Sequence, residues 1–280
     1  MSVRIFAPAK INLSLHVGPL GADGRHPLAS VVAFADVGDV VTLEEGDGLS
    51  ISGPFAAALD GENLITRALA ALGVTARVHL EKNLPIASGI GGGTADGAAA
   101  LIGANQLLRL GHHASALEGF AAALGADGPV CVAGRPAFMT GGGEQVVEIE
   151  LPPLDAVLVN PGAPLATAAV YRKFDELSAA ALLPAHAPPH WRTRAEAIAA
   201  LTEMRNDLEP AARALAPAIG DVLAVLKTAP GVPLARMSGS GATCFAILDD
   251  ATAAQSLARD LLAAHPGWWV RPARLGAASH

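Results

Sequence analysis

A glycine-rich stretch governs how this 280-residue chain can fold: Pro85-Ile86-Ala87-Ser88-Gly89-Ile90-Gly91-Gly92-Gly93-Thr94. It follows a segment that alternates between apolar and polar residues as strands do, 76–81, and it precedes a segment with helical spacing, 94–110. Glycines let neighbouring backbone N–H groups converge, and the helix behind them adds the positive end of its dipole. The pattern predicts a turn that binds an anion.

The class of this turn is narrowed by what it lacks. No Gly-Lys-Ser/Thr follows, so it is not a Walker loop, and the glycine spacing and downstream acidic residue of a dinucleotide fingerprint are missing. A flexible loop at the entrance of a helix would have the same composition. Residues elsewhere in the chain have to decide between a phosphate site and such a loop.

Two charged residues favour the phosphate site. Lys10 and Asn12 stand on the polar side of an alternating strand, 10–17, and Asp127 follows a predicted helix. Each has a simpler interpretation, because Lys10 could be a solvated strand residue and Asp127 could cap a helix or lie in an Asp-Gly turn. Together, an ammonium, a carboxylate and an anion-binding turn are the parts that phosphoryl transfer needs.

A second turn rich in glycine and serine lies near the C-terminus, Arg236-Met237-Ser238-Gly239-Ser240-Gly241-Ala242-Thr243. Hairpin geometry alone would explain it. As a functional element it would bring further backbone donors, with Arg236 nearby, to the same cleft from the second half of the chain.

The remaining pattern predicts an α+β protein of two domains, 1–152 and 153–280, joined at Pro152-Pro153. We expect the polar side of the strand 10–17 to face water. Further strands are expected at 31–34, 40–43, 76–81, 137–140, 146–151, 157–159, 243–248 and 268–270, helices at 63–72, 94–110, 114–124, 194–204, 219–226 and 251–264, and a connection at 182–191.

Composition limits the possible functions. A hydrophobic content of 51% suffices for a large core, and the absence of a long uncharged apolar run predicts a cytoplasmic protein with no membrane partner. The net charge of −7 argues against nucleic-acid binding. Cys131 and Cys244 lie in apolar runs with no CxxC partner, so we expect buried, reduced thiols. We expect a monomer or a weak homodimer.

The order and spacing of five motifs resemble those of the GHMP kinase superfamily over nearly the whole chain. The closest resemblance is to its members that act on a cytidyl-diphospho-methylerythritol. The motifs are Pro8-Ala9-Lys10-Ile11-Asn12-Leu13, Ala22-Asp23-Gly24-Arg25-His26, the glycine turn, Gly125-Ala126-Asp127 and Ser238-Gly239-Ser240-Gly241-Ala242-Thr243.

This resemblance implies a two-domain fold with the active site in the cleft between domains, and ATP, with Mg²⁺, as cofactor. It implies phosphorylation of the 2-hydroxyl of the erythritol part, in the non-mevalonate isoprenoid pathway. By the same resemblance Lys10 and Asp127 are catalytic, and the substrate is bound by Asn12, Arg25, His26, Thr167 and Tyr171. The nucleotide is bound by Asn63, Lys82, Pro85, Ser88, Gly89, Gly91, Gly92, Gly93, Thr94, Gly239 and Ser240.

Three positions depart from the pattern of the family. Arg25 replaces an aromatic residue that would sandwich the cytosine, although arginine can also stack. Ala95 removes a hydroxyl after Thr94, and Gly128 replaces an apolar residue and is expected to loosen the backbone beside Asp127.

Two alternatives remain open at this point. One is another GHMP kinase, of the homoserine or mevalonate type, and the segment 23–26 with Tyr171 discriminates against it because these residues suit a cytosine. The other is a ligand sensor that has lost catalysis, and intact Lys10 and Asp127 argue against it.

Overall fold

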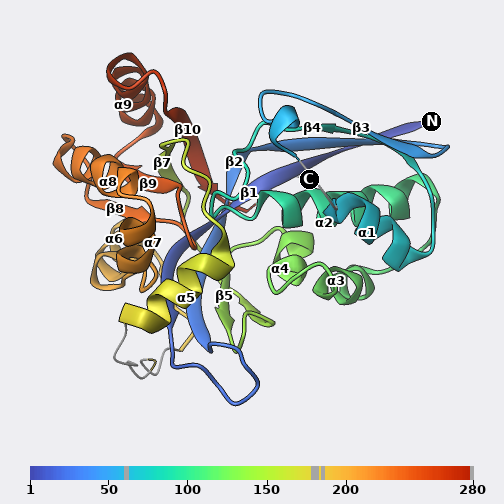
Figure 1. Ribbon diagram of the computed structural model, residues 1–280, viewed down its shortest axis with the longest axis horizontal. Helices are drawn as coiled ribbons and strands as arrows, with labels where there is room; N and C mark the ends of the chain where they lie inside the picture. The colour runs from blue at the N-terminus through green and yellow to red at the C-terminus, as the bar shows by residue number, and fades with distance from the viewer. Residues whose placement is uncertain (60–62, 178–182, 184–186, 278–280) are drawn as a thin grey trace.

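A single mixed sheet runs through the molecule in the computed structural model, which describes residues 1–59, 63–177, 183 and 187–277 (Figure 1). Its strands are β1 Ser2–Val17, β2 Leu28–Glu44, β3 Gly48–Ser52, β4 Arg77–Glu81, β5 Ala137–Thr140, β6 Gln145–Glu148, β7 Leu154–Asn160, β8 Leu234–Met237, β9 Cys244–Leu248 and β10 Trp269–Gly276. The main order is β3-β4-β2-β10-β7-β9-β8, with β1 and β5 also paired to β2 and β6 paired to β5.

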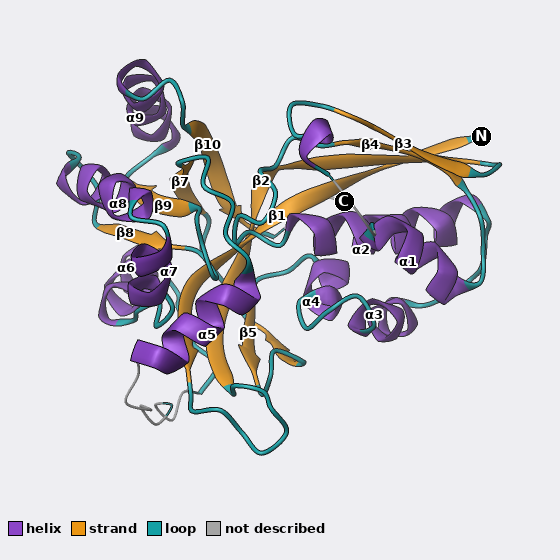
Figure 2. Ribbon diagram, in the orientation of Figure 1, coloured by secondary structure: helices purple, strands orange, loops and turns teal. Residues whose placement is uncertain are grey.

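The helices other than α5 form two groups. The helices are α1 Leu64–Leu72, α2 Gly92–Leu107, α3 Ala114–Ala122, α4 Gly128–Ala133, α5 Thr167–Leu177, α6 Arg194–Glu203, α7 Glu209–Leu215, α8 Ala218–Thr228 and α9 Ala251–Ala264, besides a 3₁₀ turn η1 at Ala56–Ala58. Figure 2 shows α1 to α4 together beneath the part of the sheet that holds β3 and β4, while α6 to α9 gather around β7 to β10. The fold is therefore α+β, as the sequence predicts.

The two halves of the chain share the sheet, because the C-terminal strand β10 pairs with β7 and also with β2 of the first half. The β2 contacts pair Leu275 with Ala35 and Gly276 with Phe34. The predicted junction at Pro152-Pro153 lies between β6 and β7. The division into 1–152 and 153–280 stays a prediction.

The hairpin of β1 and β2 carries the first functional residues. Its register shifts between Pro8 and Lys10, which marks a bulge in β1. Just after this shift the Lys10 N–H donates to Ile90 O, at 2.9 Å, in the glycine-rich turn. The bulge thus ties the strand that carries Lys10 to the turn predicted to bind phosphate.

The polar side of β1 is buried, so the expected wet face is wrong. Lys10, Asn12, Ser14 and His16 are all 5% exposed or less. Tertiary partners replace water: Ser30 Oγ accepts from Asn12 Nδ2 at 2.8 Å and donates to Ser14 O at 2.6 Å. Alternation distinguishes the two sides of a strand, but it does not show which elements cover each side.

Most of the longer predicted elements are present, and most of the ones that were not predicted are short. α4, α7, β3 and β8 have between four and seven residues, which is too few to show a clear periodicity. α5 was also not predicted. The strand expected near 268–270 continues to Gly276, and the expected connection 182–191 lies partly outside the described residues.

Gly128 replaces an apolar residue, and the sequence led us to expect a looser backbone beside Asp127. The structure shows instead that packing requires glycine at this position. It opens α4, and a Cβ at this position would lie 1.9 Å from Ala121 O of α3. The absence of a side chain lets the two helices meet. Asp127 directly precedes this close contact.

We predict that Gly128→Ala destabilises the protein by about 1–3 kcal/mol, because a backbone carbonyl cannot move aside as a side chain can. Gly119→Ala in the neighbouring α3 is the matched control, since a Cβ there would meet nothing within 4 Å. The control should gain up to about 1 kcal/mol from helix propensity. Urea unfolding measures both, and a wild-type midpoint for Gly128→Ala would contradict the packing argument.

Candidate active site

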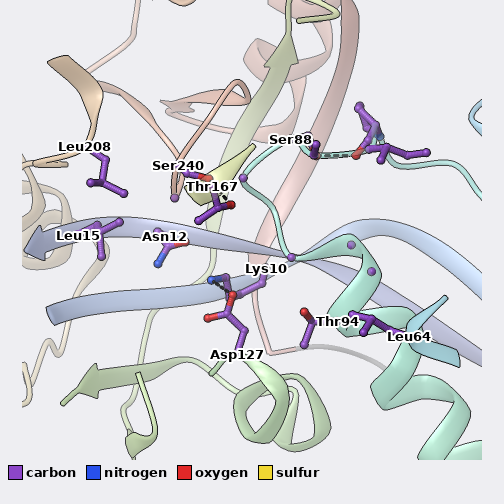
Figure 3. A pocket seen from close by; sticks show the side chains of 18 of the residues that line it. Lys10, Asn12, Leu15, Leu64, Ser88, Thr94, Asp127, Thr167, Leu208 and Ser240 are labelled. Atoms are coloured by element: carbon purple, nitrogen blue, oxygen red, sulfur yellow. Dashed lines mark hydrogen bonds and ion pairs between the residues drawn. The ribbon is translucent and has the colours of Figure 1, made fainter. Parts of the chain in front are cut away.

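A cavity of about 370 Å³ lies where β1, the glycine turn, α5 and the turn between β8 and β9 meet (Figure 3). Fifteen of the eighteen predicted site residues line it: Lys10, Asn12, Lys82, Pro85, Ser88, Gly89, Gly91, Gly92, Gly93, Thr94, Asp127, Thr167, Tyr171, Gly239 and Ser240. Segments from both halves of the chain therefore build one site.

Lys10 and Asp127 form an ion pair in this cavity. Lys10 Nζ lies 2.8 Å from Asp127 Oδ2, and the two side chains are 5% and 35% exposed. Asp127 precedes α4, but its side chain makes no capping hydrogen bond to that helix. Helix capping therefore does not apply, whereas the other simple interpretation holds: Asp127 lies in a turn in which Gly128 N donates to Gly125 O at 2.9 Å. Figure 3 shows the pair beside Thr94 at the start of α2.

The glycine turn needs glycine at two positions because of its backbone. Gly89 has φ of 75° and Gly91 has φ of 66°, in the left-handed region. Gly91 is the N-cap of α2, so the free N–H groups of this 16-residue helix open toward the cavity wall formed by Gly92, Gly93 and Thr94. This is the geometry of an anion site at a helix N-terminus.

The second glycine turn packs directly on the first. A Cβ at Gly89 would lie 2.5 Å from Ser238 O and 2.6 Å from Gly241 N. Ser88 O accepts a hydrogen bond from Thr243 N at 3.0 Å. The two turns form one backbone surface.

Beneath the glycine turn lies a buried charge cluster of Lys82, Asp39 and Asp96. Lys82 Nζ lies 2.6 Å from Asp39 Oδ2 and 2.6 Å from Asp96 Oδ2, and all three side chains are at most 4% exposed. Asp39 Oδ1 also accepts from Asn83 N and Leu84 N. The cluster joins β2, the end of β4 and the first turns of α2, so it fixes where the phosphate-binding helix begins.

The cluster has one ammonium for two carboxyl groups. Burial raises the pKa of Asp96 to about 8, and the charge of Asp39 adds to this effect while Lys82 opposes it. Burial works to lower the pKa of Lys82, but the charges and hydrogen bonds of Asp96 and Asp39 outweigh it and raise this pKa. Near neutral pH this raised pKa favours the protonated form of Asp96 beside the Lys82 ammonium.

The opposite end of the cavity carries polar and aromatic groups. Asn12 lines the cavity, and its buried Oδ1 has no hydrogen-bond partner among the described residues. Thr167 Oγ1 and Ser240 Oγ are 3.0 Å apart. Burial, and then the charge of Asp127, raises the pKa of Tyr171 to about 12, so its phenol stays neutral.

Three predicted site residues do not line the cavity. His26 lies next to it, with its ring 5.3 Å from the Tyr171 ring, but its Nδ1 lies 2.8 Å from Gly18 O. Its Nε2 lies 3.2 Å from an Asp175 carboxylate oxygen. Asn63 uses its side chain to cap α1. Arg25 lines a separate depression with Glu144.

Arg236 was expected near the cleft, and this expectation is wrong. Its buried guanidinium donates to the carbonyls of Leu13, Leu201 and Met204. Burial lowers its pKa to about 10. Three carbonyls satisfy the fork of the guanidinium, so Arg236 holds β8 to its neighbours and does not face a ligand.

Some residues of the site were missed by the sequence analysis. Asp39 and Asp96 were not singled out, although an acid in the apolar segment of β2 was an available signal. The apolar wall is formed by leucines of the β1–β2 hairpin, of the region around the start of α1 and of the segment before α7, and it leaves no single local pattern: Leu15, Leu28, Leu59, Leu64 and Leu208.

Comparison with known proteins identifies the class. The family model described as "GHMP kinases N terminal domain" matches residues 63–135, and the model "GHMP kinases C terminal" matches residues 182–267. A homoserine kinase from Cytophaga hutchinsonii superposes with a TM-score of 0.66 at 21% identity, covering 99% of this chain and 95% of that one, which shows the shared fold. The chain is a GHMP kinase by family.

Closer relatives narrow the family. A 4-diphosphocytidyl-2-C-methyl-D-erythritol kinase from Dinoroseobacter shibae is 48% identical, with 95% of this chain and 93% of the relative covered. One from Caulobacter vibrioides is 46% identical, with 98% and 100% covered. A crystal structure of a 4-(cytidine 5'-diphospho)-2C-methyl-D-erythritol kinase has a TM-score of 0.77 at 31% identity, covering 99% and 100%. This chain belongs to the family of the 4-diphosphocytidyl-2-C-methyl-D-erythritol kinases.

The charge cluster generates a prediction for stability against pH. With its pKa raised from 3.8 to about 8, Asp96 binds more protons in the folded than in the unfolded state between these values. The free energy of unfolding should therefore fall as pH rises toward 8 and just beyond.

Asp96→Asn removes this titration and keeps the size of the side chain, so its stability should fall less than that of the wild type between about pH 6 and pH 9. Urea unfolding across this range gives the two slopes. Parallel curves for the two proteins would contradict the raised pKa of Asp96.

Proposed function

We propose that this protein transfers the γ-phosphoryl group of ATP to the 2-hydroxyl of 4-diphosphocytidyl-2-C-methyl-D-erythritol, giving the 2-phosphate and ADP in the non-mevalonate pathway to isoprenoid precursors. The observation that carries this proposal is the Lys10–Asp127 ion pair, which faces the free N–H groups of the glycine turn across one cavity. Family membership supports the identity of the substrate.

Each group of residues would have a separate role in phosphoryl transfer. The glycine turn and the start of α2 would hold the triphosphate through backbone N–H groups and the helix dipole. Asp127, partly exposed to the cavity, would accept the proton of the attacking hydroxyl. Lys10 holds this carboxylate in place, and its ammonium would offset the negative charge of the transferred phosphoryl group.

The rest of the substrate would extend toward Tyr171. Asn12 lines the cavity and its Oδ1 has no partner among the described residues, so this oxygen would accept a hydrogen bond from the erythritol part. Tyr171 would stack on the cytosine, with His26 beside it. Arg25 lies outside this cavity, so we do not assign it to the sandwich.

A magnesium ion would be held mainly by the phosphates. Among the described residues no group of three or more His, Cys, Asp and Glu side chains is placed to bind a metal. Oxygen donors that suit Mg²⁺ at the start of α2 and beside Lys10 are the Thr94 hydroxyl and the Asp127 carboxylate, and both residues line the cavity. When bound with ATP, the ion would neutralise phosphate charge.

We infer that the enzyme works in the cytoplasm. ATP is its phosphoryl donor, and both cysteines, Cys131 and Cys244, are free and buried in the structure. Such thiols suit a reducing compartment. In the described part of the chain, no helix has both the length and the apolar character needed to cross a bilayer.

The proposal is tested by measuring ADP release with three alcohols in parallel: the cytidyl-diphospho-methylerythritol, mevalonate and homoserine. We expect turnover with the first alone. Asp127→Asn should lower this turnover by about 100- to 10,000-fold, because the amide cannot accept the proton.

The Asp127→Asn protein should retain the wild-type melting temperature within a few degrees, which separates loss of the base from loss of folding. Turnover of mevalonate or homoserine at an equal rate would overturn the substrate. Near-normal turnover of the variant would overturn the role of Asp127.

The aromatic end of the cavity gives a second prediction. Tyr171→Ala should raise KM for the cytidyl substrate by about 10-fold or more and leave KM for ATP nearly unchanged, because stacking on a base is worth about 1–3 kcal/mol. Tyr171→Phe keeps the ring and is the matched control. Equal loss for both ligands would contradict the stacking role.

A further inference from the structure

The segment between α6 and α7 lies across the end of β1. Leu15 N donates to Arg205 O at 2.9 Å, and Asp207 N donates to Leu15 O at 2.8 Å. These bonds make a parallel bridge between Leu15 and Asn206. The segment is thereby attached to the strand that also carries Lys10 and Asn12.

From this segment the Asn206 side chain forms hydrogen bonds to the second glycine turn. Its Nδ2 donates to Met237 O and to Gly239 O, both at 2.8 Å, and its Oδ1 accepts from Leu208 N at 3.0 Å. The residue is 5% exposed. Both amide protons and one acceptor position are therefore used inside the protein.

The turn held by Asn206 forms part of the cavity wall. Gly239 has φ of 54°, and a Cβ there would lie 2.6 Å from Gly89 O and 3.2 Å from Asn12 Oδ1. Ser238 Oγ accepts from Asn12 N and donates to Gly89 O, each at 3.0 Å. A small shift of this turn would change the space between the nucleotide turn and the substrate residue Asn12.

We propose that Asn206 is a positioning residue for phosphoryl transfer, which fixes the Gly239-Ser240 wall between Gly89 and Asn12. It touches neither ligand and acts through the two carbonyls that it binds. The reaction in which this effect is measured rests on the proposed function.

Side-chain chemistry explains why asparagine serves here. A carboxamide offers two N–H donors and an acceptor on a short stem, and both donors are needed for the Met237 and Gly239 carbonyls. A carboxylate of the same shape would place an oxygen against these two oxygens. It would keep only the bond from Leu208 N.

The test compares Asn206→Asp and Asn206→Ala with the wild type. We expect kcat to fall by about 10- to 100-fold in both, because a misplaced wall loses alignment of the reacting groups. The loss should be larger for the aspartate than for the alanine, and KM for either ligand should change less than kcat. Assays are run well below each melting temperature.

Asn105→Ala is the matched control. Asn105 also bonds backbone through both ends of its amide, to His112 N and His112 O, but it lies in the last turn of α2, at the opposite end from the glycine turn, and does not line the cavity. Its loss should lower stability and leave kcat unchanged. Wild-type kcat in Asn206→Asp would overturn the proposal.

A second readout does not depend on the reaction. Backbone hydrogen exchange of residues 238–241 should become faster in Asn206→Asp and stay unchanged in Asn105→Ala. If the wild type does not phosphorylate the cytidyl alcohol, the proposed function fails, whereas the role of Asn206 is still decided by this exchange. Unchanged exchange in the turn would overturn the proposal.

Discussion

The contact of two glycine-rich turns, backbone against backbone, is the constraint on which the rest of this structure depends. Gly89 has no room for a side chain because Ser238 O and Gly241 N lie where its Cβ would be. The turns come from opposite halves of the chain, and their meeting closes one cavity around Lys10 and Asp127. The shared sheet, completed by β10 on β2, supplies the rigid frame that brings them together.

The site provides positive groups in a protein whose net charge is negative. With a net charge of −7, the chain has no general attraction for phosphates. It instead provides Lys10 paired with Asp127, and backbone N–H groups at the start of α2. Lys82 lines the cavity, but its ammonium is buried and bonded to the carboxyl groups of Asp39 and Asp96. Its part in the site is to anchor the helix on which the triphosphate would rest.

The sequence identified many residues of the site, but it did not show which of them contact one another. Turn chemistry and helix spacing locate the glycine turn and α2, since both depend on residues close in the chain. The pairing of Asp39 with Lys82 joins residues 43 positions apart, and the bond from Ser238 to Gly89 spans 149. No periodicity records such pairs. The same limit explains why Arg236 was expected at the cleft and why the polar side of β1 was expected in water.

The sequence by itself determined that this protein has an anion-binding turn between a strand and a helix, with a lysine and an aspartate to serve it, because glycine freedom and residue period act locally. The tertiary structure alone decided which of the predicted residues share a cavity. It left Arg25 and Asn63 outside it, enclosed Lys82 between carboxylates, and made Gly128 a packing requirement. These outcomes depend on which distant surfaces bury one another, and burial is a property of the assembled fold.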